Sequence, residues 1–254
     1  MFLADKAMAA RIVDLLETAA DDRILEVGSG RGTLTELLAV SGARVISFEL
    51  DRELIEALNK KFTDIPNVKI INRDFLEVDP GDYIDGRFKL IGNIPYDITS
   101  PLIDWLMRYR SRLVRAVITV QREVGNRIVA SSGSRNRAPL SIFCQCLFEV
   151  RSVITIPPKA FYPPPRIYSS TLVFEPADKC TIDDWPYFRD IVRRAFTWRR
   201  KKLINNLVRP GTIDRTGLER ILDRLDLSSD IRAEQLSIED FIRLADNLKA
   251  AEKS

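Results

Sequence analysis

The chain has 254 residues, of which 45% are hydrophobic, and carries a formal charge of +3. This length suits one large domain with a small one, and the composition supports a substantial core. No apolar run approaches the roughly 18 residues that cross a bilayer, and no secretory signal precedes the first helix, so we expect a cytoplasmic protein without a membrane partner. Cys144, Cys146 and Cys180 form neither a disulfide framework nor a C-x-x-C pair, which fits a reducing compartment.

Histidine is absent from the sequence. This absence removes the commonest general base, the Ser-His and Cys-His nucleophile pairs and most catalytic zinc sites. Hydrolases are therefore disfavoured, and we expect no metal at the site.

The first patterned segment joins a strand, a glycine-rich turn and a helix. Apolar spacing predicts a helix over 5–16 and a strand over 24–27, and G-S-G-R-G at 28–32 then leads into a helix near Thr33. Glycines let the backbone approach a ligand closely, and a helix start offers free N–H groups. The spacing is G-x-G-x-G, whereas the dinucleotide fingerprint G-x-G-x-x-G has its third glycine one position later, which disfavours a nicotinamide enzyme.

Acidic residues follow the next two predicted strands. The strand over 44–48 ends at Glu49, where doubly wound folds place the carboxylate that binds ribose hydroxyls. A strand over 68–72 is followed by Asp74 and Phe75, a carboxylate and a ring that suit the amine and the face of an adenine. These features predict an adenosine-type ligand. Each has a structural alternative, because glycine turns and helix-capping carboxylates occur in many folds.

The motif G-N-I-P-Y at 92–96 combines an amide, a rigid proline and an aromatic ring. A strand over 88–91 precedes it and a helix follows. The Asn93 side-chain oxygen and a carbonyl near Pro95 can accept both hydrogens of an exocyclic adenine amine, and Tyr96 can stack on the ring. Two acceptors would aim the nitrogen lone pair at an electrophile by positioning. The alternative is an ordinary strand-to-helix turn.

These features are predicted to share one edge of a sheet. The glycine turn, Glu49, Asp74 and Asn93 follow four successive strands, and open α/β sheets bind ligands at the carboxyl ends of their strands. The sequence therefore predicts an α/β fold with a Rossmann-like, mostly parallel sheet.

The middle of the chain continues this sheet. Strands are predicted over 116–120 and 170–174, with a helix and a strand within 140–156. The prolines of F-Y-P-P-P-R at 161–166 stiffen the loop, so Phe161 can lie opposite Tyr96 and close a sandwich on a base. The alternative is that Phe161 belongs to the core.

Strand patterns stop near 176 and helical periods continue to the end of the chain, so we predict a first domain over 1–177 and a helical domain over 178–254. No acidic residue lies between Ile191 and Ile213. This window includes the basic run Arg193, Arg194, Arg199, Arg200, Lys201 and Lys202. The run suits RNA phosphates, with a solvated helix face as the alternative.

Together these motifs resemble the family of small-subunit ribosomal RNA adenine N6,N6-dimethyltransferases, which use S-adenosylmethionine. The similarity covers nearly the whole chain, and its length and spacing resemble archaeal members. The matching segments are L-E-V-G-S-G at 25–30, E-L-D at 49–51, Asp74, N-I-P-Y at 93–96, F-Y-P-P-P-R-I-Y-S at 161–169 and F-T-W-R-R-K at 196–201.

The resemblance implies a Rossmann-like catalytic domain that binds S-adenosylmethionine and a small helical RNA-binding domain. It implies cofactor contacts from Leu3, Gly28, Gly30, Glu49, Leu50, Asp74, Phe75 and Asn93. Asn93 and Pro95 would hold the target N6, Tyr96 and Phe161 would flank a flipped base, and Arg166 would join the basic run on RNA. The expected reaction is dimethylation of two adjacent adenosines near the 3′ end of small-subunit ribosomal RNA, by a monomer acting on an immature subunit.

The chain departs from the family pattern at its start, where only F-L remains of a G-Q-(N/H)-F-L motif. One rival interpretation is therefore an assembly or RNA-binding factor with the same fold but weak or no methyl transfer. Asn93 and Tyr96 disfavour it, because an inactive protein has no chemical need for them. A second rival is a DNA adenine methyltransferase, which the C-terminal segment disfavours.

Overall fold

The computed structural model describes residues 2–177, 179–208 and 213–252, and the chain divides into two compact units. Unit 1 comprises Met1–Gly125 and Phe148–Ala177, and unit 2 comprises Asn126–Leu147 and Asp178–Ser254. The sequence placed 126–147 in the first domain. In the structure this segment belongs to unit 2, because its helix α6 (Pro139–Leu147) packs against α7 (Trp185–Ala195).

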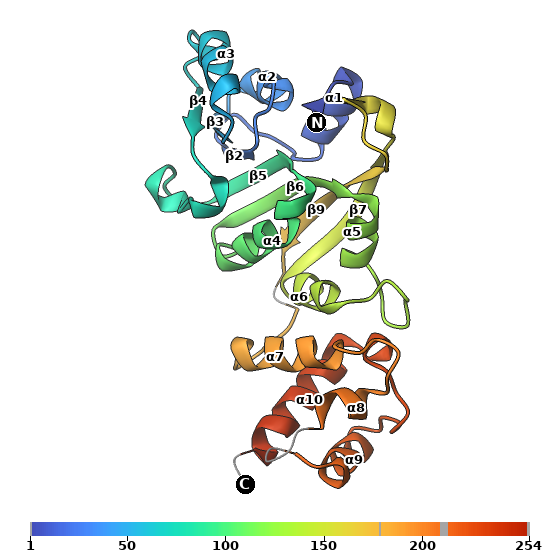
Figure 1. Ribbon diagram of the computed structural model, residues 1–254. Coiled ribbons are helices and arrows are strands. Elements are labelled where there is room, and N and C mark those ends of the chain that lie inside the picture. Colours follow the sequence, from blue (N-terminus) through green and yellow to red (C-terminus); the bar gives the residue numbers. More distant parts are fainter. Residues whose placement is uncertain (1, 178, 209–212, 253–254) are drawn as a thin grey trace. The chain divides into compact units, whose positions relative to one another are not determined.

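Unit 1 is built on a seven-stranded sheet with the order β4-β3-β2-β5-β6-β9-β7 (Figure 1). The strands are β2 (Arg23–Val27), β3 (Arg44–Glu49), β4 (Val68–Asn72), β5 (Phe88–Asn93), β6 (Leu113–Gln121), β7 (Phe148–Ile156) and β9 (Ser169–Pro176). Strands β2 to β6 run parallel, whereas β9 is antiparallel to β6 and to β7. The predicted α/β fold with a Rossmann-like, mostly parallel sheet is confirmed.

The helices of unit 1 follow from the order of the strands. They are α1 (Lys6–Asp14), α2 (Thr33–Ala39), α3 (Arg52–Phe62) and α4 (Thr99–Arg108). Helix α5 (Arg122–Ile128), which follows β6, begins in unit 1 and ends in unit 2. The chain passes from β2 to β3 and β4 in one direction and from β5 to β6 in the other, so right-handed crossovers put α2 and α3 on one face of the sheet and α4 on the opposite face (Figure 1). The direction reverses between β2 and β5, which is where such sheets form a ligand crevice.

Apolar side chains hold these layers together. Ile24, Val45 and Ile91 of the central strands are fully or almost fully buried and pack in one cluster with Leu38 of α2. Burial of each such side chain contributes about 1.5–3 kcal/mol. The core thereby fixes the carboxyl ends of β2, β3 and β5 relative to one another. The polar groups at those ends are therefore held in fixed positions as well.

A two-stranded ribbon lies apart from the main sheet in unit 1. Strand β1 (Phe2–Leu3) pairs antiparallel with β8 (Phe161–Tyr162), so that Leu3 lies opposite Phe161. The backbone N–H groups of Ala4 and Asp5 add hydrogen bonds to the Ala160 carbonyl oxygen. The ribbon fastens the start of the chain to the proline-rich segment.

Unit 2 is helical. Besides α6 and α7 it contains α8 (Leu203–Leu207), α9 (Arg215–Arg224) and α10 (Ile238–Ala251). Phe188, Leu222 and Phe241 are buried in its core. Helix α8 begins at Leu203, after a turn in which Lys201 N–H donates to the Trp198 carbonyl. Within the described residues, every helix is too short or too polar to cross a membrane.

Candidate active site

A pocket of about 180 Å³ lies at the carboxyl ends of β2 and β5, where the strand order reverses. It is lined by Phe2, Leu3, Glu26, Gly28, Ser29, Gly30, Arg31, Thr33, Leu34, Glu49, Asn93 and Pro95. All of these residues belong to unit 1. We call this the sheet-edge pocket.

The glycine turn forms one wall of the sheet-edge pocket. Gly28, Gly30 and Gly32 have φ angles of +73°, +55° and +77°, which L side chains rarely adopt. At Gly30 a Cβ atom would also lie 2.8 Å from the ring of Phe2, so the glycine lets β1 pass across the turn. Gly30 N–H donates to Glu49 Oε2 at 2.7 Å, which ties the turn after β2 to the end of β3.

Glu49 is held in place from both sides. Its second oxygen, Oε1, accepts from the backbone N–H groups of Leu50 and Asp51 at 2.9 and 3.0 Å. Hydrogen bonds to a carboxylate fix its orientation while leaving further lone pairs free. The carboxylate that the sequence assigned to ribose hydroxyls is therefore oriented before any ligand binds.

Asn93 lies at the last position of β5, beside Thr119 of β6. The preceding residue must be small, because a Cβ at Gly92 would lie only 2.9 Å from the Val27 carbonyl oxygen. This close approach of β5 to β2 brings Asn93 next to the glycine turn. Ile94 is buried and Pro95 is exposed, so the core anchors the motif while its proline faces solvent.

Glu26 places a carboxylate inside the wall of the pocket. Its side chain is fully buried, and Oε2 accepts from the hydroxyls of Thr35 at 2.7 Å and Ser47 at 2.6 Å. Its other oxygen, Oε1, has no hydrogen-bond partner among the described residues. Burial raises the pKa of Glu26 to about 7, against the lowering effect of the two hydroxyls. The pocket therefore contains an acceptor that its own protein does not satisfy.

The structure brings together part of the predicted site. Leu3, Gly28, Gly30, Glu49, Asn93 and Pro95 all line the sheet-edge pocket. Leu50, Asp74 and Phe75 do not line it. Leu50 is 66% exposed, the Asp74 carboxylate caps the short helix η1 (Phe75–Glu77), and the buried Phe75 ring packs against Phe48 and Trp105.

The two aromatic residues predicted to flank a base are Tyr96 and Phe161. Tyr96 begins the short helix η3 (Tyr96–Ile98), and its side chain lies outside the described part of the chain. Phe161 is only 3% exposed and belongs to the core cluster with Leu3, whereas the neighbouring Tyr162 is 61% exposed. In this conformation Phe161 is part of the core, which is the alternative interpretation that the sequence left open.

Six residues that line the pocket were not predicted from the sequence: Phe2, Glu26, Ser29, Arg31, Thr33 and Leu34. Glu26 carried a usable signal, because a charged residue within a four-residue apolar strand is costly to bury without a purpose. Phe2 carried none, since its position depends on pairing with a segment about 160 residues away.

The predicted RNA-binding residues fall into two groups. Several are engaged within unit 2: Arg193 lies over the Phe143 ring, Arg194 donates to the Leu207 carbonyl, Arg199 donates to the Arg135 and Arg137 carbonyls, and Lys202 pairs with Asp230. Arg200 and Lys201 in unit 2 and Arg166 in unit 1 are exposed. For these three, no ion pair occurs with any described residue.

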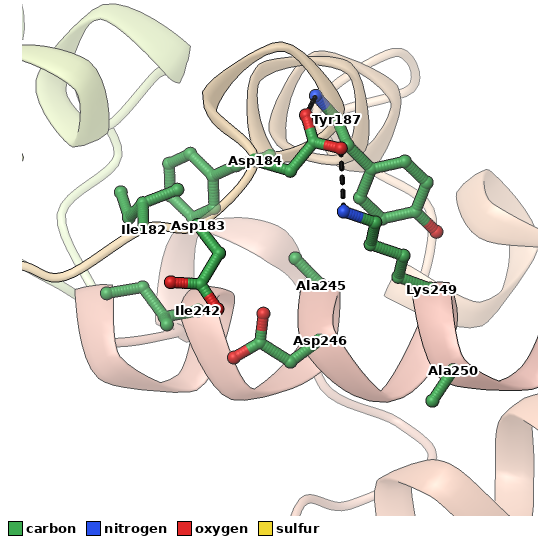
Figure 2. Close-up of a pocket in the computed structure, with 10 residues that line it drawn as sticks. Ile182, Asp183, Asp184, Tyr187, Ile242, Ala245, Asp246, Lys249 and Ala250 are labelled. Atoms are coloured by element: carbon green, nitrogen blue, oxygen red, sulfur yellow. Dashed lines mark hydrogen bonds and ion pairs between the residues drawn. The ribbon is translucent and has the colours of Figure 1, made fainter.

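A larger cavity, of about 370 Å³, lies in unit 2 between α7 and α10. Figure 2 shows the carboxylates of Asp183 and Asp246 pointing toward each other, and Lys249 paired with Asp184 at 2.7 Å. It has no glycine turn and no strand ends, and its acidic lining would repel phosphates. Size alone therefore does not mark the active site, and we assign the chemistry to the smaller sheet-edge pocket.

The sheet-edge pocket suits S-adenosylmethionine by the chemistry of its groups. The unpartnered oxygen of Glu26 suits a cationic ligand group, and Glu49 suits ribose hydroxyls. Pockets for small molecules usually measure about 300–1,000 Å³, so the enclosed volume holds only part of such a ligand. The rest would extend into the open mouth or require a shift of β1, which lines the pocket.

Comparison with known proteins identifies the family. The family model for ribosomal RNA adenine dimethylases matches residues 1–250. The ribosomal RNA small subunit methyltransferase A of Geobacter metallireducens is 38% identical over 251 residues, which cover 96% of this chain and 91% of that protein. The protein of the same name from Caldanaerobacter subterraneus subsp. tengcongensis is 38% identical over 255 residues, covering 97% and 94%. Both relatives are bacterial and give no support to an archaeal affinity.

Solved structures agree on the architecture. A dimethyladenosine transferase from Plasmodium falciparum has a TM-score of 0.83 at 23% identity, covering 96% of each chain, which supports the fold. The 23S rRNA methyltransferase ErmE has a TM-score of 0.76 at 27% identity, covering 98% of this chain and all of that one. The chain belongs to the ribosomal RNA adenine dimethylase family and is an S-adenosylmethionine-dependent methyltransferase.

Proposed function

We propose that this enzyme dimethylates N6 of two adjacent adenosines near the 3′ end of small-subunit ribosomal RNA. The observation that carries the proposal is the position of Asn93, which lines the same pocket as the glycine turn and Glu49. An acceptor for an adenine amine and the binding groups for a nucleoside cofactor therefore meet at one edge of the sheet. The names of the curated relatives specify the small subunit, whereas ErmE is named for 23S rRNA.

The protein's part in the reaction is positioning. In the first transfer the Asn93 side-chain oxygen and the Pro95 carbonyl would accept the two N6 hydrogens and direct the nitrogen lone pair toward the methyl donor. In the second transfer one hydrogen remains for these acceptors, and each transfer releases one N6 proton to solvent. S-adenosylmethionine supplies a methyl group activated on a sulfonium. The target base must leave its stack or already be unpaired, because Asn93 cannot reach N6 inside a helix.

Tyr96 and Phe161 would flank the flipped base. Because Phe161 belongs to β8 of the ribbon and its ring is buried, its participation requires the ribbon to open when the base enters. Such an opening would couple the base site to the sheet-edge pocket, since Phe2 and Leu3 of the same ribbon line that pocket.

RNA would be held by Arg166 and by the basic run of unit 2, with exposed Arg200 and Lys201 as its freest cations. We place the enzyme in the cytoplasm, as a monomer that acts on an immature small subunit. Leu50, Asp74 and Phe75 would reach the part of the cofactor that extends beyond the enclosed volume.

The deciding experiment incubates the protein with labelled S-adenosylmethionine and immature small subunits that lack the modification, followed by digestion of the RNA and identification of methylated nucleosides. We expect dimethyladenosine in small-subunit RNA. Parallel reactions offer 23S rRNA and DNA as substrates, and label there with none in the small subunit would redirect the substrate assignment. Tight subunit binding without methyladenosine would favour an assembly factor.

A further inference from the structure

Arg31 is the one basic residue that lines the sheet-edge pocket in the described part of the chain. It stands between Gly30 and Gly32, and its side chain is exposed at the pocket mouth. The guanidinium carbon lies 5.1 Å from the ring centroid of Phe2 and 5.8 Å from that of Tyr162. Within the described residues it has no carboxylate partner. Two aromatic rings therefore hold a cation whose charge is not neutralised.

Two carboxyl groups line the interior of the same pocket. Glu26 is buried there with one oxygen unpartnered, and Glu49 also lines the pocket, where it accepts from Gly30 N–H. A ligand that carries a carboxylate would be repelled from these groups and attracted to the cation at the mouth. The charged groups of the pocket thus determine the orientation of a ligand that carries both a positive and a negative group.

We propose that Arg31 binds the α-carboxylate of S-adenosylmethionine and that Phe2 and Tyr162 hold its guanidinium in position. An arginine can bind a carboxylate through two parallel, charge-assisted hydrogen bonds. The rings restrict the rotamers of a long side chain, so less entropy is lost when the ligand binds. Arg31 would then bind the carboxylate end of the cofactor and so orient it in the pocket.

A structural role predicts a different result. If Arg31 only fastens the β1–β8 ribbon through its two rings, its removal should weaken every ligand of the pocket alike. If Arg31 contacts the carboxylate, its removal should weaken the binding only of ligands that carry the carboxylate. Comparison of S-adenosylmethionine with its decarboxylated analogue separates the two roles without any RNA present.

The experiment measures binding of both ligands to the full chain by calorimetry, for the wild type and for Arg31→Gln. We expect Kd for S-adenosylmethionine to rise about ten-fold, in line with a charge-assisted hydrogen bond at an exposed position, and Kd for the analogue to change less than about two-fold. Arg44→Gln is the matched control, because Arg44 is an exposed arginine at the amino end of β3, away from the pocket, and should leave both values unchanged.

Equal weakening of both ligands, or no weakening of either, would overturn the assignment. If Arg31→Gln fails to fold, as judged by circular dichroism, Arg31→Lys tests the same point. It keeps the charge but loses the bidentate geometry, so a selective loss for S-adenosylmethionine is again required. A wrong RNA substrate would leave these binding results untouched, so the two proposals fail separately.

Discussion

A buried carboxylate with an unsatisfied oxygen makes Glu26 a source of pH dependence. Its pKa is raised to about 7 in the folded protein, so the folded state binds a proton that the unfolded state has released. The contribution of Glu26 to stability is therefore greatest below about pH 4.5 and is lost as the pH rises through 7. The hydroxyls of Thr35 and Ser47 reduce this cost but do not remove it.

We expect Glu26→Gln to abolish this pH dependence. At pH 8 the variant should be more stable than the wild type by up to about 3 kcal/mol, and the advantage should shrink toward zero near pH 5. Urea unfolding of both proteins across this range measures the difference, in which the titration of other groups cancels. A constant difference at all pH values would show that Glu26 is ionised throughout.

Asn93→Ala tests the catalytic assignment at the same scale. Removing the side-chain oxygen leaves the N6 amine without one of its two acceptors, and loss of a positioned polar group of this type costs roughly 100-fold or more in rate. We expect methyl transfer to be abolished while the Kd for RNA is unchanged. Single-turnover transfer and filter binding measure the two quantities, and unchanged transfer would remove Asn93 from the mechanism.

At the scale of elements, the site depends on how closely β5 approaches β2. We expect Gly92→Ala to destabilise the protein by about 1–3 kcal/mol, because the new Cβ would lie 2.9 Å from the Val27 carbonyl and 3.0 Å from its Cβ. The strands must separate to admit it, which displaces Asn93. Denaturant unfolding measures the stability, and transfer should fall even where the variant is fully folded. Full activity in the folded variant would show that this spacing is not critical.

The predictable elements are those with local signals. Strand β4 matches its predicted range of 68–72, because the β-branched residues that favour a strand lie within the segment itself. The glycine turn, Glu49 and Asn93 could also be placed at one edge, since parallel strands share their carboxyl ends.

The unpredictable elements depend on distant partners. Strand β1 has two residues, too few for any periodicity, and exists because it pairs with β8. Phe161 of β8 is buried, as in the core alternative, whereas the proline-rich sequence had suggested that it could lie opposite Tyr96 on a base. The same holds for 126–147, whose helix packs within unit 2 although its sequence follows directly on the sheet.

At the scale of the whole molecule, a net charge of +3 conceals an uneven distribution. Arginine and lysine side chains that already pair within unit 2, such as Arg194 and Lys202, cost energy to redirect toward RNA. Arg200 and Lys201 are exposed in the turn before α8 and are not committed to another described residue in this way. RNA affinity should therefore depend on these two more than on the rest of the basic run.

The double variant Arg200→Glu, Lys201→Glu tests this distribution. We expect weaker binding to small-subunit RNA, and a plot of log Kd against log salt whose slope is smaller by about 1.5, because two phosphate contacts are lost. The matched control Arg220→Glu, Arg224→Glu changes the net charge equally on exposed positions of α9. Both variants change the net charge of the protein equally. An equal loss of RNA affinity in the control would mean that binding depends on the total charge of unit 2. A loss only in Arg200→Glu, Lys201→Glu would place the RNA contact at the turn before α8.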